Sequence, residues 1–322
     1  MQRRNLLSAL VVSIFGLSPL AASAQTNDFP RKPITVICPW TAGGGTDTLL
    51  RALAREAEKY VGQTINVVNQ TGGAGAVGHN AIRAAAPDGY TVGMITFELN
   101  SLPPQGLVPF TYKDFDPLMR INVDPAALTV KKDAPYNTLK EFVDYAKAHP
   151  EEITIGNSAP GSVWHIAAGL MADKTGVRVK HVPFDGAQPA VTALLGGHIK
   201  AVAVSVPEVR AQVQAGNLKI IGVMDNVRDE LFPAVPTFKE QGVDVAFSTW
   251  RGLGLPKGVP ADVKVKLNDA FKRAFDSKDF KDFAARASLN LAYQNAGDFN
   301  KFLEQNYKDV DAVMKTLGLA KK

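Results

Sequence analysis

Short apolar runs alternate with longer amphipathic runs along most of the chain. The apolar runs are rich in β-branched residues and are bounded by turn residues, so they predict strands at 34–38, 64–69, 90–96, 153–158, 177–184, 200–206 and 219–224. In the longer runs apolar residues recur every three or four positions, as Leu49, Leu53 and Ala57 do, and this spacing predicts helices. The predicted helices cover 47–61, 75–86, 137–149, 162–176, 187–197, 207–216, 260–276 and 296–318.

This alternation of strands and helices indicates an α/β protein whose parallel sheets are covered by helices. One unit, a strand followed by a glycine loop and a helix, occurs at 34–61 and again at 153–175. Two such units without a flexible linker between them predict two lobes that face each other. Ligands of such sheets bind beyond the carboxyl ends of the strands, which is where both glycine loops lie.

The first 24 residues have a different pattern. Arg3 and Arg4 precede an apolar stretch over 6–17, and small residues follow, ending in Ala22-Ser23-Ala24. This order is typical of a secretory signal peptide, and it predicts export with cleavage after Ala24. A membrane anchor is the alternative. It fits less well, because the apolar stretch is interrupted by serine, glycine and proline, whereas a spanning helix needs about 20 apolar residues.

Composition and charge exclude few classes of protein. The chain has 322 residues, of which 46% are hydrophobic and 21% charged, and the length favours two domains. Without Arg3 and Arg4 the formal charge falls from +5 to +3, since 34 Lys and Arg then stand against 31 Asp and Glu. No basic block occurs, so nucleic-acid binding is not expected. Cys38 is the single cysteine; we expect it to be a small buried residue rather than a disulfide or zinc ligand.

The segment "PWTAGGGTD", residues 39–47, joins the first predicted strand to the first predicted helix. A phosphate loop would need a lysine after its last glycine, and no lysine occurs between Lys32 and Lys59. A dinucleotide loop would need a third glycine at position 48, which is Thr48. The remaining interpretation is an anion cradle, in which backbone N–H groups at the helix N-terminus face a negatively charged ligand. Asp47 is expected to cap the helix.

A second loop, "GNSAPGSVWH" at 156–165, has the same chemistry. Asn157, Ser158 and Ser162 supply hydrogen-bond donors at another helix N-terminus, and Ser162 is the expected cap. His165, on the first turn, either donates to an anion or packs as a local partner of the cap. The segment "PFDGA" at 183–187 is a third loop between a strand and a helix.

Catalytic motifs are missing from the sequence. The nucleophile motif G-x-S-x-G does not occur, because "GNSAPG" has one residue too many. The five histidines are scattered, without the short spacing that a zinc site needs. We therefore expect no enzyme, no cofactor and no metal.

Taken together, the motifs resemble those of a known family. In chain order they are "PWTAGGGTD", "NQTGGAGAVG", "AAAPDGYT", "HVPFDGAQPA", "LLGGHI" and "TWRGLGLPKGVP". In this order the sequence resembles the Bug-type extracytoplasmic solute receptors, the periplasmic binding proteins of tripartite tricarboxylate transporters. The resemblance covers essentially the whole mature chain.

The resemblance implies a two-lobed, type II periplasmic-binding-protein fold, with a mostly parallel sheet in each lobe and a ligand cleft between the lobes. It implies lobe 1 at 25–125 plus 227–322 and lobe 2 at 126–226. A carboxylate would be bound by main-chain amides and small polar side chains. The binding residues carried over are Trp40, Thr41, Ala42, Gly43, Gly44, Thr46, Asp47, Ser158, Ser162, His165, Phe184, Asp185, Gly186, Ser205 and Trp250.

Three further residues bear on the ligand. Ser205 stands where many relatives carry an aspartate at a strand end, so the resemblance favours a plain di- or tricarboxylate over an amino acid. Glu98 follows a predicted strand, and Arg251 follows Trp250. Arg251 either faces the cleft and binds a second carboxylate of the ligand, or faces water as a solvated charge.

The expected function is that of a monomeric periplasmic receptor that delivers a small carboxylate to the membrane components of such a transporter. A receptor that feeds a sensor kinase and, more remotely, a secreted hydrolase on the same fold are the alternatives. The lobes would close around the ligand by a population shift.

Overall fold

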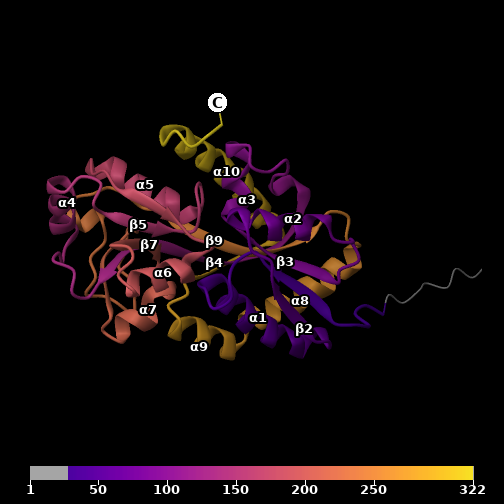
Figure 1. Ribbon diagram of the computed structural model, residues 1–322. Helices are drawn as coiled ribbons and strands as arrows, with labels where there is room; N and C mark the ends of the chain where they lie inside the picture. The colour runs from indigo at the N-terminus through magenta and orange to yellow at the C-terminus, as the bar shows by residue number, and fades with distance from the viewer. Residues whose placement is uncertain (1–27, 322) are drawn as a thin grey trace, which may run out of the picture.

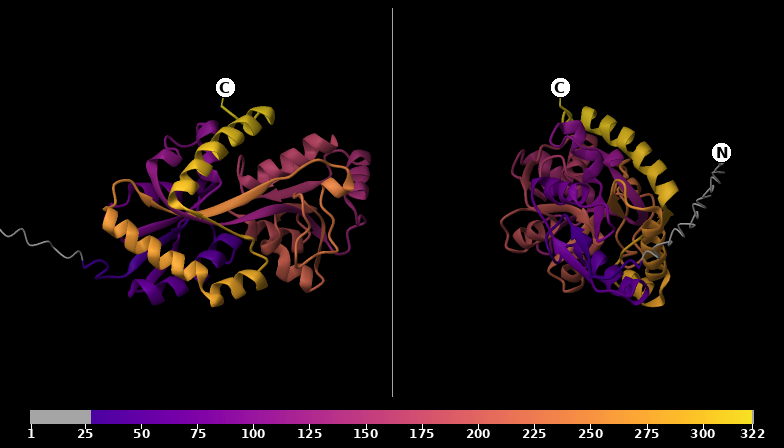
Figure 2. Two further views of the ribbon diagram at one scale, coloured as in Figure 1. Left: turned by 180° about the vertical axis from the view of Figure 1, so that it is seen from behind. Right: turned by 90° about the vertical axis from the view of Figure 1, so that its right-hand side faces the viewer.

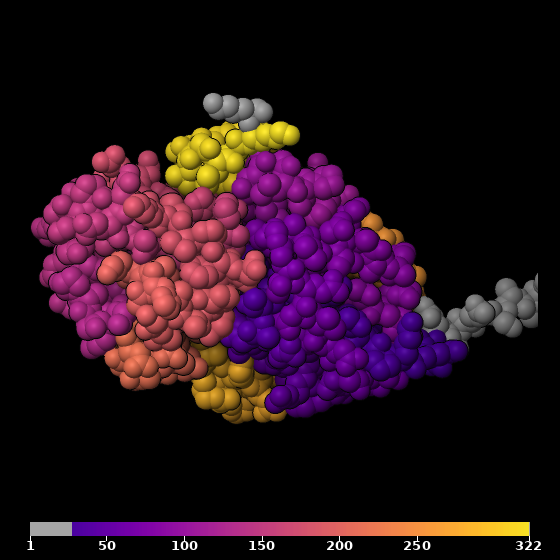
Figure 3. All heavy atoms as spheres, in the orientation of Figure 1, coloured from indigo at the N-terminus to yellow at the C-terminus, as the bar shows by residue number. Residues whose placement is uncertain are grey.

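A computed structural model describes residues 28–321 and shows two lobes joined by long strands (Figure 1). The predicted signal peptide and its cleavage site lie outside the described residues. The two lobes touch along a narrow seam on the face shown in Figure 3. Within residues 28–321, none of the helices is both long and apolar enough to cross a membrane.

Lobe 1 contains the N-terminal and C-terminal parts of the chain. Its strands are β1 (Ile34–Cys38), β2 (Ile65–Asn69), β3 (Thr91–Thr96), β9 (Ser248–Pro256), β10 (Leu291–Asn295) and the first part of β4 (Phe115–Lys131). Its α-helices are α1 (Gly45–Val61), α2 (Ala76–Ala84), α3 (Glu98–Ser101), α8 (Ala261–Asp276), α9 (Lys278–Arg286) and α10 (Ala296–Thr316). Three short 3₁₀ turns complete it: η1 (Gly73–Gly75), η2 (Pro103–Gln105) and η3 (Tyr112–Asp114).

Lobe 2 is built from the middle of the chain. Its strands are the second part of β4, β5 (Thr154–Asn157), β6 (Lys180–Pro183), β7 (Ala201–Ser205) and β8 (Leu218–Val223). Its helices are α4 (Leu139–Ala148), α5 (Val163–Thr175), α6 (Ala187–Leu195) and α7 (Val206–Gln214), and the turn η4 (Lys239–Gln241) follows on the return path. Where the sequence predicts an element, the observed bounds agree with the prediction to within a few residues, but the sequence analysis did not predict β4, β9, β10, α3 or α9.

The two sheets share strand β4, which is 17 residues long. Its residues up to Pro125 pair with β9, and from Ala126 onward it pairs with β7 and β8. The strand order is β2-β1-β3-β9-β4-β7-β5-β6. The pairs β1–β2, β1–β3, β5–β6 and β5–β7 are parallel, but every pair that involves β4 or β9 is antiparallel.

The sheets are therefore mixed, which differs from the expected mostly parallel arrangement. Strand β4 carries Pro117 and Pro125 and has two register shifts against β9, and β9 carries two glycines. Proline and glycine weaken the sequence signal for a strand, and for this reason neither strand was predicted.

Two apolar clusters stabilise the fold. One lies in lobe 1, among β1, β3, α1, α8 and α9, and includes Leu49, Leu53 and the predicted buried residue Cys38. The other fills lobe 2 and continues along β4 to α10, where Phe299 and Leu303 are fully buried. Helix α10 runs along one side of the molecule over the strands that join the lobes (Figure 2). The C-terminal helix thus packs where the chain passes between lobes.

Candidate functional site

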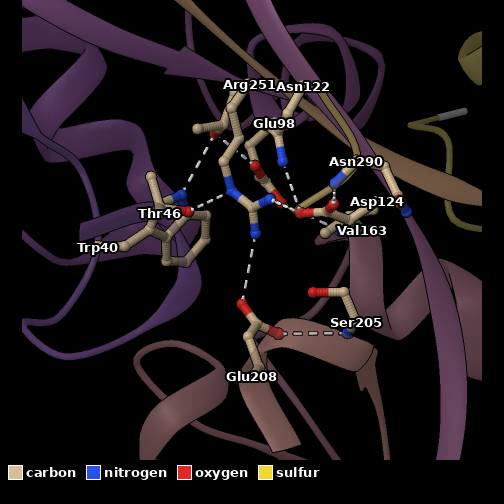
Figure 4. Close-up of polar contacts among 11 residues, drawn as sticks. Trp40, Thr46, Glu98, Asn122, Asp124, Val163, Ser205, Glu208, Arg251 and Asn290 are labelled. Atoms are coloured by element: carbon tan, nitrogen blue, oxygen red, sulfur yellow. Dashed lines mark hydrogen bonds and ion pairs between the residues drawn. The ribbon is translucent and has the colours of Figure 1, made fainter. Parts of the chain in front are cut away.

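A polar pocket lies between the lobes, at the N-termini of α1 and α5 (Figure 4). The free space at its centre is about 20 Å³, which holds one or two water molecules. The lining comes from both lobes: Trp40, Thr41, Gly44, Gly45, Thr46, Thr96, Glu98, Ser158, Val163, Trp164, Ala187, Glu208, Thr249 and Arg251. The two glycine loops thus meet across the cleft, as the sequence predicts.

The loop before α1 is shaped by its glycines. Gly43 has φ +80°, a left-handed conformation that favours glycine, and Gly44 is the extended N-cap of the helix. The Gly43 N–H donates to Asp47 Oδ2 at 2.9 Å, and Arg51 pairs with the same carboxylate. Burial acts to raise the pKa of Asp47, but hydrogen bonds from Arg51, Gly43 and Asn69 outweigh it and hold the pKa below its usual value. Asp47 therefore organises the loop and does not line the pocket.

Arg251 crosses the pocket from β9 and is 1% exposed. Its Nε donates to Thr46 Oγ1 at 2.8 Å, and its Nη1 lies 2.5 Å from Asp124 Oδ2. Its Nη2 reaches Glu208 Oε1 of lobe 2 at 3.5 Å. The alternative in which Arg251 is a solvated charge is therefore wrong. The guanidinium connects the α1 N-terminus, the shared strand β4 and the opposite lobe.

Asp124 is the principal counter-charge of Arg251. Asn122 Nδ2 donates to its Oδ2 at 2.6 Å and the Asn290 N–H donates to its Oδ1 at 3.0 Å. Complete burial raises the pKa of Asp124, and the charge of Arg251 opposes that rise. Both oxygens accept hydrogen bonds, which favours the charged form of the carboxylate.

Glu208 projects into the pocket from the first turn of α7 in lobe 2. The Ser205 N–H donates to its Oε2 at 3.3 Å. A β-carbon placed on Gly45 would lie only 3.2 Å from Glu208 Oε1, so this carboxylate sits against the α1 N-terminus of lobe 1. Burial, together with the nearby charge of Asp124 and against that of Arg251, raises the pKa of Glu208 to about 7.

Glu98 makes the reciprocal contact, from lobe 1 to lobe 2. It begins α3, directly beyond β3, and its Oε1 accepts from the Val163 N–H at the N-terminus of α5, at 3.1 Å. Thr96 Oγ1 donates to its Oε2 at 2.6 Å, and Trp40 Nε1 donates in turn to Thr96 Oγ1. Burial raises the pKa of Glu98, and these hydrogen bonds oppose the rise.

In the loop before α5, serine and histidine serve mainly local roles. Ser162 is the N-cap of α5, and its hydroxyl oxygen accepts from Ser158 Oγ at 2.9 Å. Of the two serines, only Ser158 is part of the pocket lining. His165 Nδ1 accepts from the Gly161 N–H at 2.8 Å, and burial, with a contribution from His181, lowers the pKa of His165 to about 4. His165 is therefore neutral near pH 7 and acts as a local partner of this turn.

A wider opening continues outward from Thr41. It is lined by Phe184 and Asp185, together with Gly73, Ala74, Ala159, Pro160, Pro183 and Pro189. The absence of a side chain at Gly186 allows the lobes to approach closely here, because a β-carbon at that position would lie 2.9 Å from Thr41 Oγ1. This opening gives the site a largely apolar outer part.

Four other carried-over residues do not line the central pocket. Ala42 and Gly43 are exposed on the outer side of their loop, and Ser205 is the buried N-cap of α7. Trp250 donates from Nε1 to Asn306 and packs on the rings of Phe299 and Phe302 in α10. Trp250 does not line the pocket because neighbours on a strand point to opposite faces: Thr249 and Arg251 face the pocket and Trp250 faces away.

Two lining residues, Glu208 and Thr96, lie outside every loop and motif that the sequence analysis singled out as a ligand site. The others that were not named individually lie within those segments: Gly45, Val163, Trp164, Ala187 and Thr249. The sequence does contain a pattern that points to Glu208, since "SVPE" at 205–208 is a capping-box sequence that starts at the end of the strand predicted at 200–206. The acid absent at position 205 is thus supplied three residues later. Among residues 28–321 there is no cluster of three His, Cys, Asp or Glu side chains that could bind a metal ion.

Comparisons with known proteins agree with this architecture. The model of the tripartite tricarboxylate transporter family receptor, TctC, matches residues 49–319. BugT of Bordetella pertussis is 31% identical over 83% of this chain and 84% of its own. A TctC solute-binding protein from Polaromonas, solved without ligand, is 39% identical, covers 89% of this chain and 99% of its own, and has a TM-score of 0.66.

An R. palustris protein solved with adipate is 26% identical, covers 91% of this chain and 99% of its own, and has a TM-score of 0.87. Its two-lobed fold is the one described above. The chain belongs to the Bug-type receptors of the tripartite tricarboxylate transporter family, which are non-enzymatic solute-binding proteins.

Proposed function

We propose that this protein captures a small organic carboxylate in the periplasm and, as a monomer, delivers it to the membrane components of a tripartite tricarboxylate transporter. The observation that carries the proposal is the polar pocket between the lobes, where two helix N-termini and Arg251 converge. Helix N-termini and a guanidinium are the groups that favour a carboxylate. The adipate complex of a relative adds support.

Closure of the lobes is the proposed response to the ligand. The ligand-free Polaromonas protein is 39% identical but superposes with a TM-score of 0.66, whereas the adipate-bound protein, at 26% identity, reaches 0.87. A score over the whole chain falls when two lobes are placed differently. This contrast supports a receptor in which lobes rotate about β4 and β9, as in hinged binding proteins.

The sequence led us to expect a plain di- or tricarboxylate, because Ser205 replaces an acid in the cleft. Glu98 and Glu208 place two acids there, so that reason no longer applies.

A thermal-shift screen of the mature protein tests the proposal. We expect at least one acid among succinate, malate, citrate, adipate, succinamate and benzoate to raise the melting temperature, because a ligand that binds only the folded state stabilises it by about 2.7 kcal/mol at 100 times its Kd. Glucose and sodium chloride serve as controls. A shift with glucose or a cation, and with none of the acids, would refute carboxylate binding.

Transport and sensing are separable in cells. Deletion of the gene should abolish cellular uptake of the acid that binds. The transcriptional response to the same acid, measured in the same strain, should be unchanged. If uptake continues and only a transcriptional response is lost, the receptor serves a sensor instead.

Gly45→Ala should weaken ligand binding while leaving the fold intact. Its new β-carbon would lie 3.1 Å from Glu208 Cγ and 3.2 Å from Arg251 Nη2, so Glu208 must move before the lobes can close. Within α1 the change is neutral or favourable, since alanine is the better helix former. We expect a Kd about tenfold higher for the acid with the largest thermal shift, measured by calorimetry, with the unfolding free energy within about 1 kcal/mol of wild type.

Gly297→Ala is the matched control. Gly297 lies near the N-terminus of α10, is exposed, and would bring its β-carbon no closer than 3.4 Å to a neighbour. The Gly297→Ala variant should bind the acid with the same affinity as wild type. Equal affinities for Gly45→Ala and wild type would show that closure does not bring Glu208 against α1.

A further inference from the structure

A separate cavity lies beside α10, the helix that covers the strands joining the lobes (Figure 2). Its volume is about 370 Å³, within the range of roughly 300–1,000 Å³ that is typical of small-molecule sites. Helix α10 lines one side of the cavity with residues at positions i, i+3, i+4 and i+7, which share one face of a helix: Asn306, Asp309, Val310 and Val313. Ile166 of α5 lines it from lobe 2. The cavity is therefore bounded by both lobes.

This cavity and the central pocket adjoin each other across the backbone. Phe97 lines the cavity, and the next residue, Glu98, lines the central pocket. At the start of β9, Ser248 lines the cavity and Thr249 lines the central pocket, because neighbours on a strand point to opposite faces. The two spaces share no lining residue among those that the structure describes. A molecule in the cavity would therefore leave the central pocket accessible.

The apolar part of the lining is aromatic. The rings of Phe97 and Phe247 meet edge to face, with their centroids 5.4 Å apart and their planes at 71°. Ile166 and Val310 are buried beside the same space. Such a surface favours a flat apolar group, because ring packing adds to the gain from burying apolar area.

The charged part of the lining is acidic. Asp225 follows β8, Asp309 lies on α10, and the lining formed by the described residues includes no Lys, Arg or His. The two carboxylates accept hydrogen bonds from neutral groups: Asp225 Oδ1 from the Asn226 N–H at 2.7 Å, and Asp309 Oδ1 from Gln305 Nε2 at 2.9 Å. No ion pair of either carboxylate is among the described contacts. An ammonium group would supply the missing counter-charge, whereas an anion would be repelled.

We infer that this cavity is a second ligand site, for an organic cation with an apolar body such as an aromatic amine, and that its occupancy favours the closed lobes. The ring packs on the pair formed by Phe97 and Phe247, and the ammonium pairs with an aspartate of the lining. A ligand that contacts both lobes stabilises the arrangement in which they meet. The amine site goes beyond the proposed function, and only its link to closure rests on that function.

Calorimetric titration of the protein at pH 7, without any acid ligand, tests the site. Tryptamine and tryptophol share an indole ring and a two-carbon arm, but the first ends in an ammonium and the second in a hydroxyl group. Phenethylamine and 2-phenylethanol form a smaller pair of the same kind. In at least one pair we expect the amine to bind at 1:1 stoichiometry and at least about tenfold more tightly than the alcohol. Binding of neither amine, or equal affinities within both pairs, would overturn the inference.

A variant that fills the cavity tests where the amine binds. Ala246 is exposed and lines the cavity, so Ala246→Trp should weaken binding of the amine at least tenfold. Val265→Trp is the control, since Val265 is 68% exposed on α8 and is not part of the lining. Circular dichroism and melting temperature confirm that both variants fold. Unchanged amine affinity in Ala246→Trp would place the amine elsewhere and refute the site.

A double variant tests the role of the charge. Asp225→Asn with Asp309→Asn should weaken the amine about tenfold and leave the affinity for the alcohol unchanged. The control is Asp269→Asn with Asp311→Asn, which changes the net charge equally but at ion pairs outside the cavity. Equal losses in the two double variants would show a general effect of charge and contradict recognition by the cavity.

The link to closure has its own measurement. The acid with the largest thermal shift should bind about fivefold more tightly when the amine is saturating, and the amine should gain by the same factor when the acid is saturating. Ala246→Trp should remove this effect. Equal acid affinities with and without the amine would reject the link to closure. Failure of every acid to bind would refute the proposed function instead, because the amine titration is made without an acid.

Discussion

Arg251→Met is expected to lower the free energy of unfolding by about 3–5 kcal/mol at pH 8, because it leaves Asp124 and Glu208 buried without their counter-charge. Methionine keeps the apolar length of the side chain, so little of the loss should come from a cavity. At pH 5 the loss should be smaller, since the two acids can then take up protons. Urea unfolding at both pH values measures the difference.

The control for this change is Lys308→Met. Lys308 forms an exposed ion pair with Glu304 on α10, at 3.1 Å, with the two side chains 62% and 55% exposed. Such a pair contributes about 0–1 kcal/mol, so the loss should stay within that range. A loss for Arg251→Met below about 1 kcal/mol at pH 8, or one of equal size at pH 5, would contradict the view of Arg251 as the counter-charge of the pocket.

Glu208→Gln should make the protein more stable than wild type at pH 8 and remove part of its pH dependence. The pKa of Glu208 is about 7 in the folded protein, against 4.5 for an ordinary glutamate. Between these values the folded state binds a proton that the unfolded state does not. The stabilisation that comes from protonated Glu208 is therefore fully present below about pH 4.5 and is lost as the pH rises through about 7. The difference in unfolding free energy between variant and wild type should therefore change by on the order of 3 kcal/mol between pH 4.5 and pH 8.5.

The measurement is the unfolding free energy of both proteins from pH 4.5 to pH 8.5. The pKa values of His79 and His165 are lowered to about 4 by burial, so both histidines destabilise the protein as the pH falls. They are present in wild type and variant alike, so their contribution cancels in the difference. Glu304→Gln should give a flat difference curve. A flat curve for Glu208→Gln would show that Glu208 is not protonated in the folded protein near neutral pH.

The sequence predicted some residues of this pocket but not the pocket as a whole. The motif "PWTAGGGTD" predicted an anion-binding helix N-terminus, and Thr41, Gly44 and Thr46 do line the pocket. Glu98 and Arg251 stood out because each adjoins a strand or a family motif. Neither observation showed that they lie in one pocket, since Arg251 and Asp124 are 127 residues apart.

Local chemistry determined the elements of this protein. Repeated apolar spacing placed the α1, α5 and α10 helices within a few residues, because a helix or strand leaves a periodic pattern in its own segment. The Ser162 cap of α5 was readable for the same reason, since a cap involves residues only a few positions apart. The cap expected at Asp47 was wrong, because Gly44 is the N-cap of α1 and Asp47 lies within its first turn.

The tertiary structure alone decided which charges meet. Long strands β4 and β9, broken by proline and glycine in sequence, carry Asp124 and Arg251 into the cleft, and strand alternation turns Trp250 away. Glu98 and Glu208 each reach the helix N-terminus of the other lobe only because the lobes face each other. Contacts between distant segments leave no periodic trace in the sequence, so the cluster of buried acids around Arg251 emerged only from the fold.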